Sequence, residues 1–209
     1  MKIRDQERIY IVGNNTGVGK TIVSAILTEA FEADYWKPIQ AGDLDNSDSN
    51  TVSHLISNST SQIHPEAFLL QEPMSPHAAA EREGIEISLQ SIAVPNTSRQ
   101  LIIESAGGIL SPVNRKATMR DLAMHLQAPA LVVSRHYLGS INHTLLTLEA
   151  LKAKQIPVLG VIFVGEPEPE SETVIVGMGG TKMLGRISWE ASFSPMLVSQ
   201  YARLLREIL

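Results

Sequence analysis

Short apolar runs alternate with amphipathic stretches along the chain. The runs are rich in β-branched residues and apolar at nearly every position, as strands covered on both faces should be; they span 9–13, 34–39, 100–104, 130–134, 158–164 and 183–187. Apolar residues recur at helical spacing in 20–31, 140–153 and 194–209. This alternation predicts an α/β fold with a mostly parallel, doubly wound sheet and helices on both faces.

Polar and glycine-rich stretches separate these elements. Residues 43–53 follow a strand end, so they can reach a site at the carboxyl edge of the sheet, whereas 165–173 are expected to form a solvated loop. The glycines of 177–181 are interpreted as a turn, because no lysine follows at the step a second phosphate loop requires. Residues 75–84 predict a short helix with Pro76 at its first position. Without a repeat or a long linker, 1–209 is interpreted as one domain.

Composition narrows the class of protein. The 209 residues are 44% hydrophobic with a net charge of -5, which indicates a globular chain and argues against a nucleic-acid partner. The absence of cysteine excludes disulfides and cysteine metal sites. The first residues lack the apolar segment of a secretory signal, and no apolar run reaches the roughly 18 residues of a membrane helix. We therefore expect a soluble, cytoplasmic protein without a membrane partner.

The clearest chemical motif is "IYIVGNNTGVGKT", residues 9–21. A strand leads into a glycine-rich loop and a helix leads out, which is the setting of a phosphate-binding loop. The glycines let backbone N–H groups turn toward phosphate, and the helix N-terminus adds partial positive charge. Lys20 can face the outer phosphates, and the Thr21 hydroxyl can bind Mg²⁺. The alternative interpretation is a glycine-rich turn followed by a surface lysine.

Three further groups of residues could complete such a site. Lys37, in "WKPIQAG", could neutralise a phosphate or a carbamate, or could equally be a solvated lysine. Glu104, at the tip of the apolar run in "LIIESAGG", is placed to hold Mg²⁺ directly or through water, unless it simply ends the strand. Asp43, Asp45 and Asp48 lie in an acidic stretch, where one could bind the metal although such stretches are usually solvated. The histidines show no ligand spacing and no catalytic triad.

The ordered set of motifs resembles the dethiobiotin synthetase family. Five residues separate Gly13 from Gly19. This spacing resembles the loop of that family and differs from that of a standard Walker A loop. "WKPIQAG", "NSDS", "MSPHAAAEREG", "IESAGGILSPV" and "YLGSINHTLLTLEAL" resemble its blocks in the same order, from residue 9 to about 165. The last 40 residues are less similar. The resemblance implies a P-loop NTPase fold.

It also implies a reaction in biotin biosynthesis, a ligation that consumes ATP and needs Mg²⁺. One amine of 7,8-diaminononanoate takes up CO₂ to form a carbamate, which attacks the γ-phosphate of ATP. The neighbouring amine then closes the ureido ring and phosphate leaves. No protein nucleophile is required, so catalysis rests on positioning and charge neutralisation.

Site residues follow from the resemblance, position by position. Lys20 and Lys37 would be catalytic, and Thr21, Asp48 and Glu104 would hold Mg²⁺. Nucleotide would contact the loop and the end of a later strand, at Gly13, Asn14, Asn15, Thr16, Gly17, Val18, Gly19, Lys20, Thr21, Val164 and Gly165. The small-molecule substrate would contact Thr16, Lys37, Ala41 and Ser75 and, from the other subunit of a homodimer, Leu138, Gly139, Ile141 and Asn142.

Four positions depart from the family pattern. Ser105 replaces a glycine, Ala41 a serine, Val164 an asparagine that reads the base, and Ser188 a proline near the base. The lysine and metal positions are intact, so we expect activity with looser base recognition.

Two other functions remain open. A deviant Walker-type switch ATPase would carry a signature lysine five places before Lys20, where this chain has Asn15. An inactive paralogue that only binds nucleotide is disfavoured by the intact Lys20, Lys37 and Glu104.

Overall fold

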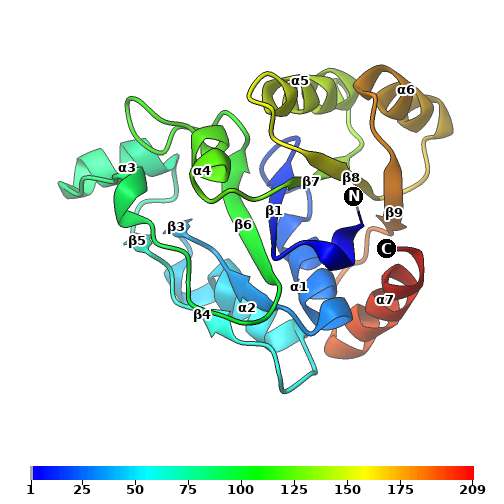
Figure 1. Cartoon of the computed structure of the whole chain (residues 1–209), viewed down its shortest axis with the longest axis horizontal. Helices are drawn as coiled ribbons and strands as arrows, with labels where there is room; N and C mark the ends of the chain where they lie inside the picture. Colours follow the sequence, from blue (N-terminus) through cyan, green and yellow to red (C-terminus); the bar gives the residue numbers. More distant parts are fainter. Residues whose placement is uncertain (1) are drawn as a thin grey trace.

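The computed structural model describes residues 2–209 and has a parallel sheet at its centre (Figure 1). The sheet has seven strands, whose order is β4 (Ile63–His64), β2 (Asp34–Trp36), β6 (Leu101–Gly108), β1 (Arg8–Gly13), β7 (Ala130–Arg135), β8 (Val158–Val164) and β9 (Met183–Ile187). Neighbouring strands pair in parallel throughout. A small second sheet pairs β3 (Ile39–Ala41) with β5 (Phe68–Leu70). The predicted doubly wound α/β fold is confirmed.

Helices cover both faces of the sheet (Figure 1). One face packs on α1 (Lys20–Phe31), α2 (Asp48–Leu55) and α7 (Pro195–Ile208). The other packs on α3 (Pro76–Glu83), α4 (Met119–His125), α5 (Ser140–Lys152) and α6 (Pro169–Gly179). Short 3₁₀ turns lie at Ile3–Asp5, Leu44–Asn46 and Leu89–Ser91. The helices predicted over 20–31, 75–84, 140–153 and 194–209 are therefore present, with Pro76 at the start of α3.

The strands are buried on both sides, and their side chains alternate between two cores. In β6, Leu101 and Ile103 lie in the core under α3–α6, whereas Ile102 lies in the core under α1, α2 and α7. Successive side chains of a strand point to opposite faces. Glu104 therefore lies on the same face as Ile102, the face that carries α1. Its carboxylate lies next to Thr21, at the start of that helix.

Two sequence predictions need correction. Residues 34–39 do not form one strand, because Pro38 lacks the N–H needed for a sheet ladder and restricts Lys37 before it. The chain breaks there into β2 and β3, which belong to different sheets. The loop predicted over 165–173 becomes helix α6 from Pro169 onward. Proline at the first position and glutamates in the first turn favour a helix start.

Smaller corrections concern the glycines and the acidic stretch. Gly177 and Gly179 lie within α6, and the turn begins only at Gly180, which has a left-handed conformation with φ of 53°. Within 43–53, the Ser47 hydroxyl accepts a hydrogen bond from the Asn50 backbone and starts α2. Asp48 is thus the first residue of a helix instead of part of a free loop.

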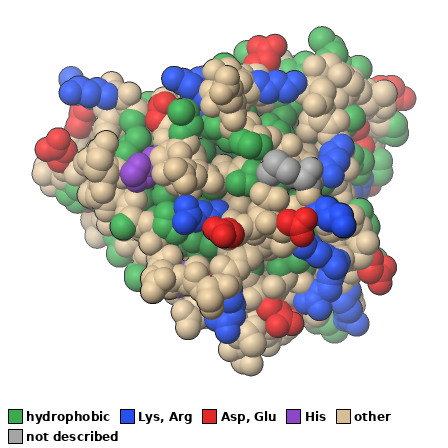
Figure 2. All heavy atoms as spheres, in the orientation of Figure 1, with side chains coloured by type: hydrophobic (Ala, Val, Ile, Leu, Met, Phe, Trp, Pro, Cys, Tyr) green, Lys and Arg blue, Asp and Glu red, His purple; other side chains and the backbone are tan. Residues whose placement is uncertain are grey.

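The outer surface mixes polar and apolar side chains. On the face in Figure 2, acidic and basic side chains are interspersed, with apolar atoms between them. Among residues 2–209, no helix has both the length and the apolar character to cross a membrane.

Candidate functional site

The loop between β1 and α1 has the geometry of a phosphate cradle. Gly17 and Gly19 adopt left-handed conformations, with φ of 69° and 97°. A Cβ on Gly13 would lie 2.6 Å from the Val18 side chain and 2.7 Å from the Asn15 carbonyl oxygen, so the first loop glycine is needed at position 13. Lys20 begins α1 and is 7% exposed, with its Nζ atom 3.4 Å from the Asn15 carbonyl.

Asn14 anchors this loop to the rest of the sheet. Its side-chain amide donates to Thr144 Oγ1 (3.1 Å), Ser134 Oγ (3.3 Å) and the Arg135 carbonyl (3.3 Å). Ser134 and Thr144 also bond each other at 2.9 Å, and all three side chains are buried. The sequence did not predict this network, and its one signal was the polar Ser134 in the otherwise apolar run 130–134.

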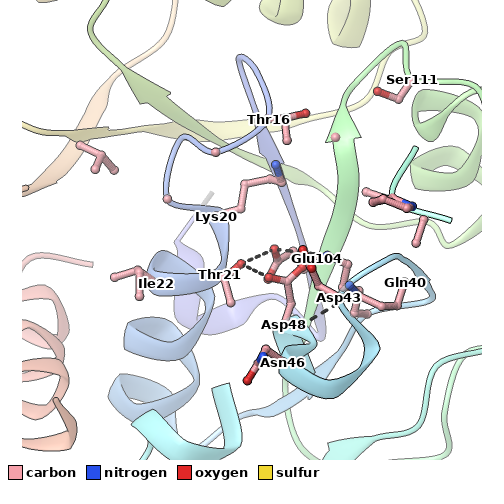
Figure 3. A pocket seen from close by; sticks show the side chains of 18 of the residues that line it. Thr16, Lys20, Thr21, Ile22, Gln40, Asp43, Asn46, Asp48, Glu104 and Ser111 are labelled. Carbon is pink, nitrogen blue, oxygen red and sulfur yellow. Dashed lines mark hydrogen bonds and ion pairs between the residues drawn. The ribbon is translucent and has the colours of Figure 1, made fainter. Parts of the chain in front are cut away.

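The three predicted metal ligands Thr21, Asp48 and Glu104 meet in one cluster beside the loop (Figure 3). Thr21 Oγ1 lies 2.6 Å from Asp48 Oδ1 and 2.9 Å from Glu104 Oε1. Lys37 forms an ion pair with Asp48, and its Nζ atom is 3.9 Å from Glu104 Oε1. The residues come from α1, α2, β6 and the break between β2 and β3, so the fold assembles a cluster that local sequence does not contain.

Burial shifts the ionisation of the lysines in this cluster. Desolvation lowers the pKa of Lys20 to about 8; the Glu104 charge opposes this shift and Lys37 adds to it. Desolvation also lowers the pKa of Lys37, and Glu104 and Glu66 oppose that shift. An anionic ligand at this site would favour the charged ammonium forms, because opposite charges nearby raise the pKa of a lysine.

Tyr35 contacts the cluster on the side away from the cavity. Its hydroxyl donates to Glu104 Oε2 at 2.9 Å, and its side chain is fully buried. Burial raises the pKa of Tyr35 well above its ordinary value, and Glu104 raises it further, so the phenol remains a donor. The sequence analysis missed Tyr35, because an aromatic residue in an apolar strand is typical of the core.

The cluster fits a hard divalent cation. The Thr21 hydroxyl and the carboxylates of Asp48 and Glu104 are oxygen donors, which suit Mg²⁺. Within residues 2–209, no three His, Cys, Asp or Glu side chains come together as a metal-binding group. Two carboxylates and a hydroxyl still match Mg²⁺, which keeps several water or phosphate ligands and rarely uses a cage made only of protein.

A cavity of about 750 Å³ connects these residues. Its lining includes most of the predicted site: Thr16, Gly17, Gly19, Lys20, Thr21, Lys37, Ala41, Asp48, Ser75, Glu104 and Val164. The other loop residues Gly13, Asn14, Asn15 and Val18, together with Gly165, do not line it. Leu138, Gly139, Ile141 and Asn142 also lie outside its lining, at the start of α5, where the Leu138 side chain is exposed.

The far end of the cavity is less polar. Val164 is 4% exposed and lies against Gly19, where an added Cβ would be 3.3 Å from Val164 Cγ1. Trp189, which the sequence analysis missed, also lines the cavity, and the Arg135 guanidinium lies 3.6 Å from its ring centre. The Ser188 backbone N–H donates to Tyr201 Oη at 3.1 Å.

Ser105 and Ala41 are two further positions at which the sequence is expected to differ from the family pattern. Ser105 is buried, and its hydroxyl donates to the Gly107 carbonyl at 3.1 Å. This hydroxyl is satisfied within its own turn. Ala41 lines the cavity, so no side-chain hydroxyl is offered at that position.

A glycine-rich loop between a strand and a helix, at the carboxyl edge of a parallel sheet, defines a P-loop nucleotide-binding protein. The sequence family described as "AAA domain" matches residues 7–196. The ATP-dependent dethiobiotin synthetase BioD of Christiangramia forsetii is 50% identical over 198 residues, which cover 95% of each chain. That of Cytophaga hutchinsonii is 47% identical and covers 94% of this chain and 95% of its own. The chain belongs to the dethiobiotin synthetase family.

Solved structures confirm the fold alone. A ParA family ATPase from Chlorobium tepidum has a TM-score of 0.58 at 13% identity, and the match covers 94% of this chain and 99% of that one. The cell division ATPase MinD of Pyrococcus furiosus has a TM-score of 0.57 at 12% identity, with 97% and 100% covered. Both are similar in architecture.

Proposed function

We propose that this chain is an ATP-dependent dethiobiotin synthetase, which closes the ureido ring of dethiobiotin from 7,8-diaminononanoate and CO₂. The observation that carries the proposal is the partly buried cluster of Lys37, Thr21, Asp48 and Glu104 beside the phosphate loop, in one cavity with Lys20. Membership of the family supplies the substrate class.

In the proposed reaction, the carbamate oxygen of the substrate attacks the γ-phosphorus of ATP, and the bond to ADP breaks. The second amine then attacks the carbonyl carbon of this carbamic-phosphoric anhydride, loses a proton and expels phosphate. The ammonium groups of Lys20 and Lys37 neutralise charge on the transferring group, and such preorganised charge is usually the largest catalytic contribution. Thr21, Asp48 and Glu104 would hold Mg²⁺, which supplies further neutralisation of the phosphate oxygens.

The start of α5 would serve a second subunit. Leu138, Gly139, Ile141 and Asn142 lie outside the lining of the cavity in their own chain, and Leu138 and Asn142 are exposed. Backbone N–H groups at a helix start favour a carboxylate, as the substrate carries. A homodimer in which each α5 start completes the other cavity accounts for these positions.

A product assay tests the reaction. Protein, ATP, Mg²⁺, bicarbonate and 7,8-diaminononanoate should give dethiobiotin by mass spectrometry, with one ADP formed for each ring closed. Omission of the diamine should abolish ADP formation. Nucleotide hydrolysis that proceeds equally without the diamine, and without product, would instead favour a switch ATPase.

Subunit mixing tests the homodimer. Lys20→Ala disables the phosphate loop, and Gly139→Leu disables the start of α5, because Gly139 has a φ of 98° that side chains rarely adopt. In a shared-site dimer, mixed pairs hold one site with both lesions and one with neither, so roughly a quarter of wild-type activity should return at equal mixing. No recovery, despite proven subunit exchange, would indicate a site built within one chain.

A further inference from the structure

The Tyr35 side chain reaches from one strand to Glu104, in the middle of the neighbouring strand. In the sheet register, Tyr35 of β2 lies opposite Ile102 of β6, and both side chains lie in the core under α1, α2 and α7. Glu104 is two residues further along β6, or about 6.6 Å at the usual rise of a strand. Aromatic side chains can bridge such diagonal positions, and the Tyr35 hydroxyl does so to Glu104 Oε2 at 2.9 Å.

The two oxygens of Glu104 face different surroundings. Oε1 contacts Thr21 and lies 3.9 Å from Lys37 Nζ, and both of these residues line the cavity. Oε2 contacts Tyr35, which does not line the cavity. Glu104 is only 1% exposed, so water has little access to its carboxylate. The Tyr35 contact is therefore the one on the side of the carboxylate away from any ligand.

The contacts on the cavity side are the ones a ligand would change. The Thr21 hydroxyl has one proton and can donate to only one of the two carboxylates that it touches. Lys37 divides its charge between Asp48 and Glu104. Bound phosphate and a cation would recruit both groups, whereas the Tyr35 hydrogen bond needs no rearrangement.

We propose that Tyr35 is a positioning residue, which fixes the Glu104 carboxylate so that Oε1 stays directed at the cavity for a divalent cation. The inference rests on the metal site of the proposed function. Partners of this kind, which hold a metal ligand in place, typically contribute 10- to 100-fold in metal affinity. Tyr35→Phe should therefore weaken the Mg²⁺ contribution to nucleotide binding about tenfold, and leave kcat at saturating Mg²⁺ nearly unchanged.

The chain contains a matched control in Tyr10. Its side chain is also fully buried, but on the opposite face of the sheet, where Met119 Sδ, at 3.5 Å, is the one hydrogen-bond partner of its hydroxyl among residues 2–209. Tyr10→Phe removes the same oxygen from an equally buried tyrosine that lies away from the cluster. It should leave the Mg²⁺ contribution at the wild-type value.

Calorimetry with the β,γ-imido analogue of ATP measures the effect without turnover. For each protein, the dissociation constant of the analogue in EDTA is divided by its dissociation constant in excess Mg²⁺. This ratio measures how much Mg²⁺ strengthens nucleotide binding. The ratio should fall strongly in Glu104→Gln, about tenfold in Tyr35→Phe and not in Tyr10→Phe, while the values in EDTA stay similar. Tyr35→Phe should add nothing in the Glu104→Gln background.

The outcomes separate the inference from the proposed function. A ratio in Tyr35→Phe equal to that of Tyr10→Phe, with Glu104→Gln impaired, overturns the role of Tyr35 alone. A further loss in the Glu104→Gln background also overturns it, because the effect would not pass through Glu104. If Glu104→Gln has the same ratio as the wild type, Glu104 does not bind the metal. The metal site of the proposed function and the role of Tyr35 are then both wrong.

A measurement on the unsubstituted side chain covers the case in which Tyr35→Phe does not fold. The chain has four tyrosines, so uniform 3-fluorotyrosine labelling gives few ¹⁹F resonances. Substitution of Tyr10, Tyr137 and Tyr201 assigns the Tyr35 signal by elimination. Addition of Mg²⁺ to the analogue complex should shift the Tyr35 resonance more than that of Tyr10. An unmoved Tyr35 resonance would overturn the proposal.

Discussion

The two ends of the cavity are built by different means. At the phosphate end, Lys20, Lys37 and Glu104 are 7%, 6% and 1% exposed, and each lies close to polar or charged atoms of its neighbours. At the other end, Val164 offers an apolar surface, and Trp189 remains 52% exposed under the Arg135 guanidinium. Buried charged side chains line the first end, whereas an apolar side chain and the partly exposed Trp189 ring line the second.

The difference affects how readily each end should tolerate a substitution. Loss of one partner from a buried charge pair typically costs about 3–5 kcal/mol, so such positions are interdependent. Packing against the face of a base does not require a particular side chain, because every base has an apolar face. Val164 lies at the second end, whereas Lys20, Lys37 and Glu104 lie at the first. Recognition of phosphate should thus be strict and recognition of the base permissive.

The largest expected effect comes from the lysines of the phosphate end. Lys20→Ala and Lys37→Ala should each lower turnover by about 10²-fold or more, because each removes positive charge aimed at the transferring phosphoryl group. The measurement is dethiobiotin formation, with circular dichroism to verify folding. Lys116→Ala, at an exposed position, should have no effect. Near-normal turnover of Lys37→Ala would leave that residue a structural role.

The proposed metal ligands should give the next largest effect. Glu104→Gln keeps the shape and removes the charge, and should weaken apparent Mg²⁺ affinity about ten- to hundredfold, equivalent to about 1.5–3 kcal/mol for a contact with a charged group. Asp48→Asn should have a smaller effect, because the Asp48 side chain is 29% exposed and that of Glu104 only 1%. A Mg²⁺ titration of turnover that Glu104→Gln leaves unchanged would contradict a metal role.

A pH titration should detect the buried lysine. Burial lowers the pKa of Lys20 to about 8, so the free protein loses this positive charge as pH rises through that value. Bound phosphate favours the charged form, and nucleotide affinity should therefore fall above pH 8, by at most about tenfold per unit for one proton. Lys20→Arg, which stays charged, should flatten the profile of ADP binding measured by calorimetry. A flat wild-type profile would argue against a depressed pKa.

The smallest effects should come from the base end. Val164 cannot hydrogen-bond a base edge as an asparagine can, and a lost pair of bonds removes about 1–3 kcal/mol of discrimination. ATP, GTP and CTP should therefore support ring closure with kcat/KM values within about tenfold. Val164→Asn should shift the series toward ATP. A preference for ATP above about 100-fold in the wild type would show that other groups read adenine.

Sequence alone predicted the parts whose signal is local. The strand–loop–helix at residues 9–31, the helix at 140–153 and the existence of a strand at Glu104 follow from periodicity and glycine spacing, although that strand was predicted to end at residue 104 and continues to Gly108. The contacts that organise the site join distant positions: Tyr35 and Glu104 are 69 residues apart, and Asn14 and Thr144 are 130 apart. No spacing rule pairs such residues, because the sheet order that makes them neighbours is a property of the whole fold.

The helix α6 illustrates a second limit. Its first residues read as an acidic loop, yet Glu172 lies within an ion pair with Arg186 and a 3.0 Å contact with His136. Those partners come from β9 and from the residue after β7. Tertiary contacts of the buried Glu172 thus help to form a helix turn from a stretch that is otherwise polar and exposed.

The buried amide of Asn14 has a consequence for the timing of ligand capture. Its three hydrogen bonds hold the loop in place before any nucleotide arrives. A preformed loop does not have to rearrange around phosphate. The association rate constant of nucleotide should therefore be limited by diffusional encounter and not by a slower loop rearrangement. The Asn14 backbone N–H, which donates to the Val133 carbonyl at 2.9 Å, should then exchange slowly with solvent deuterium even in the nucleotide-free protein, and Asn14→Ala should speed its exchange.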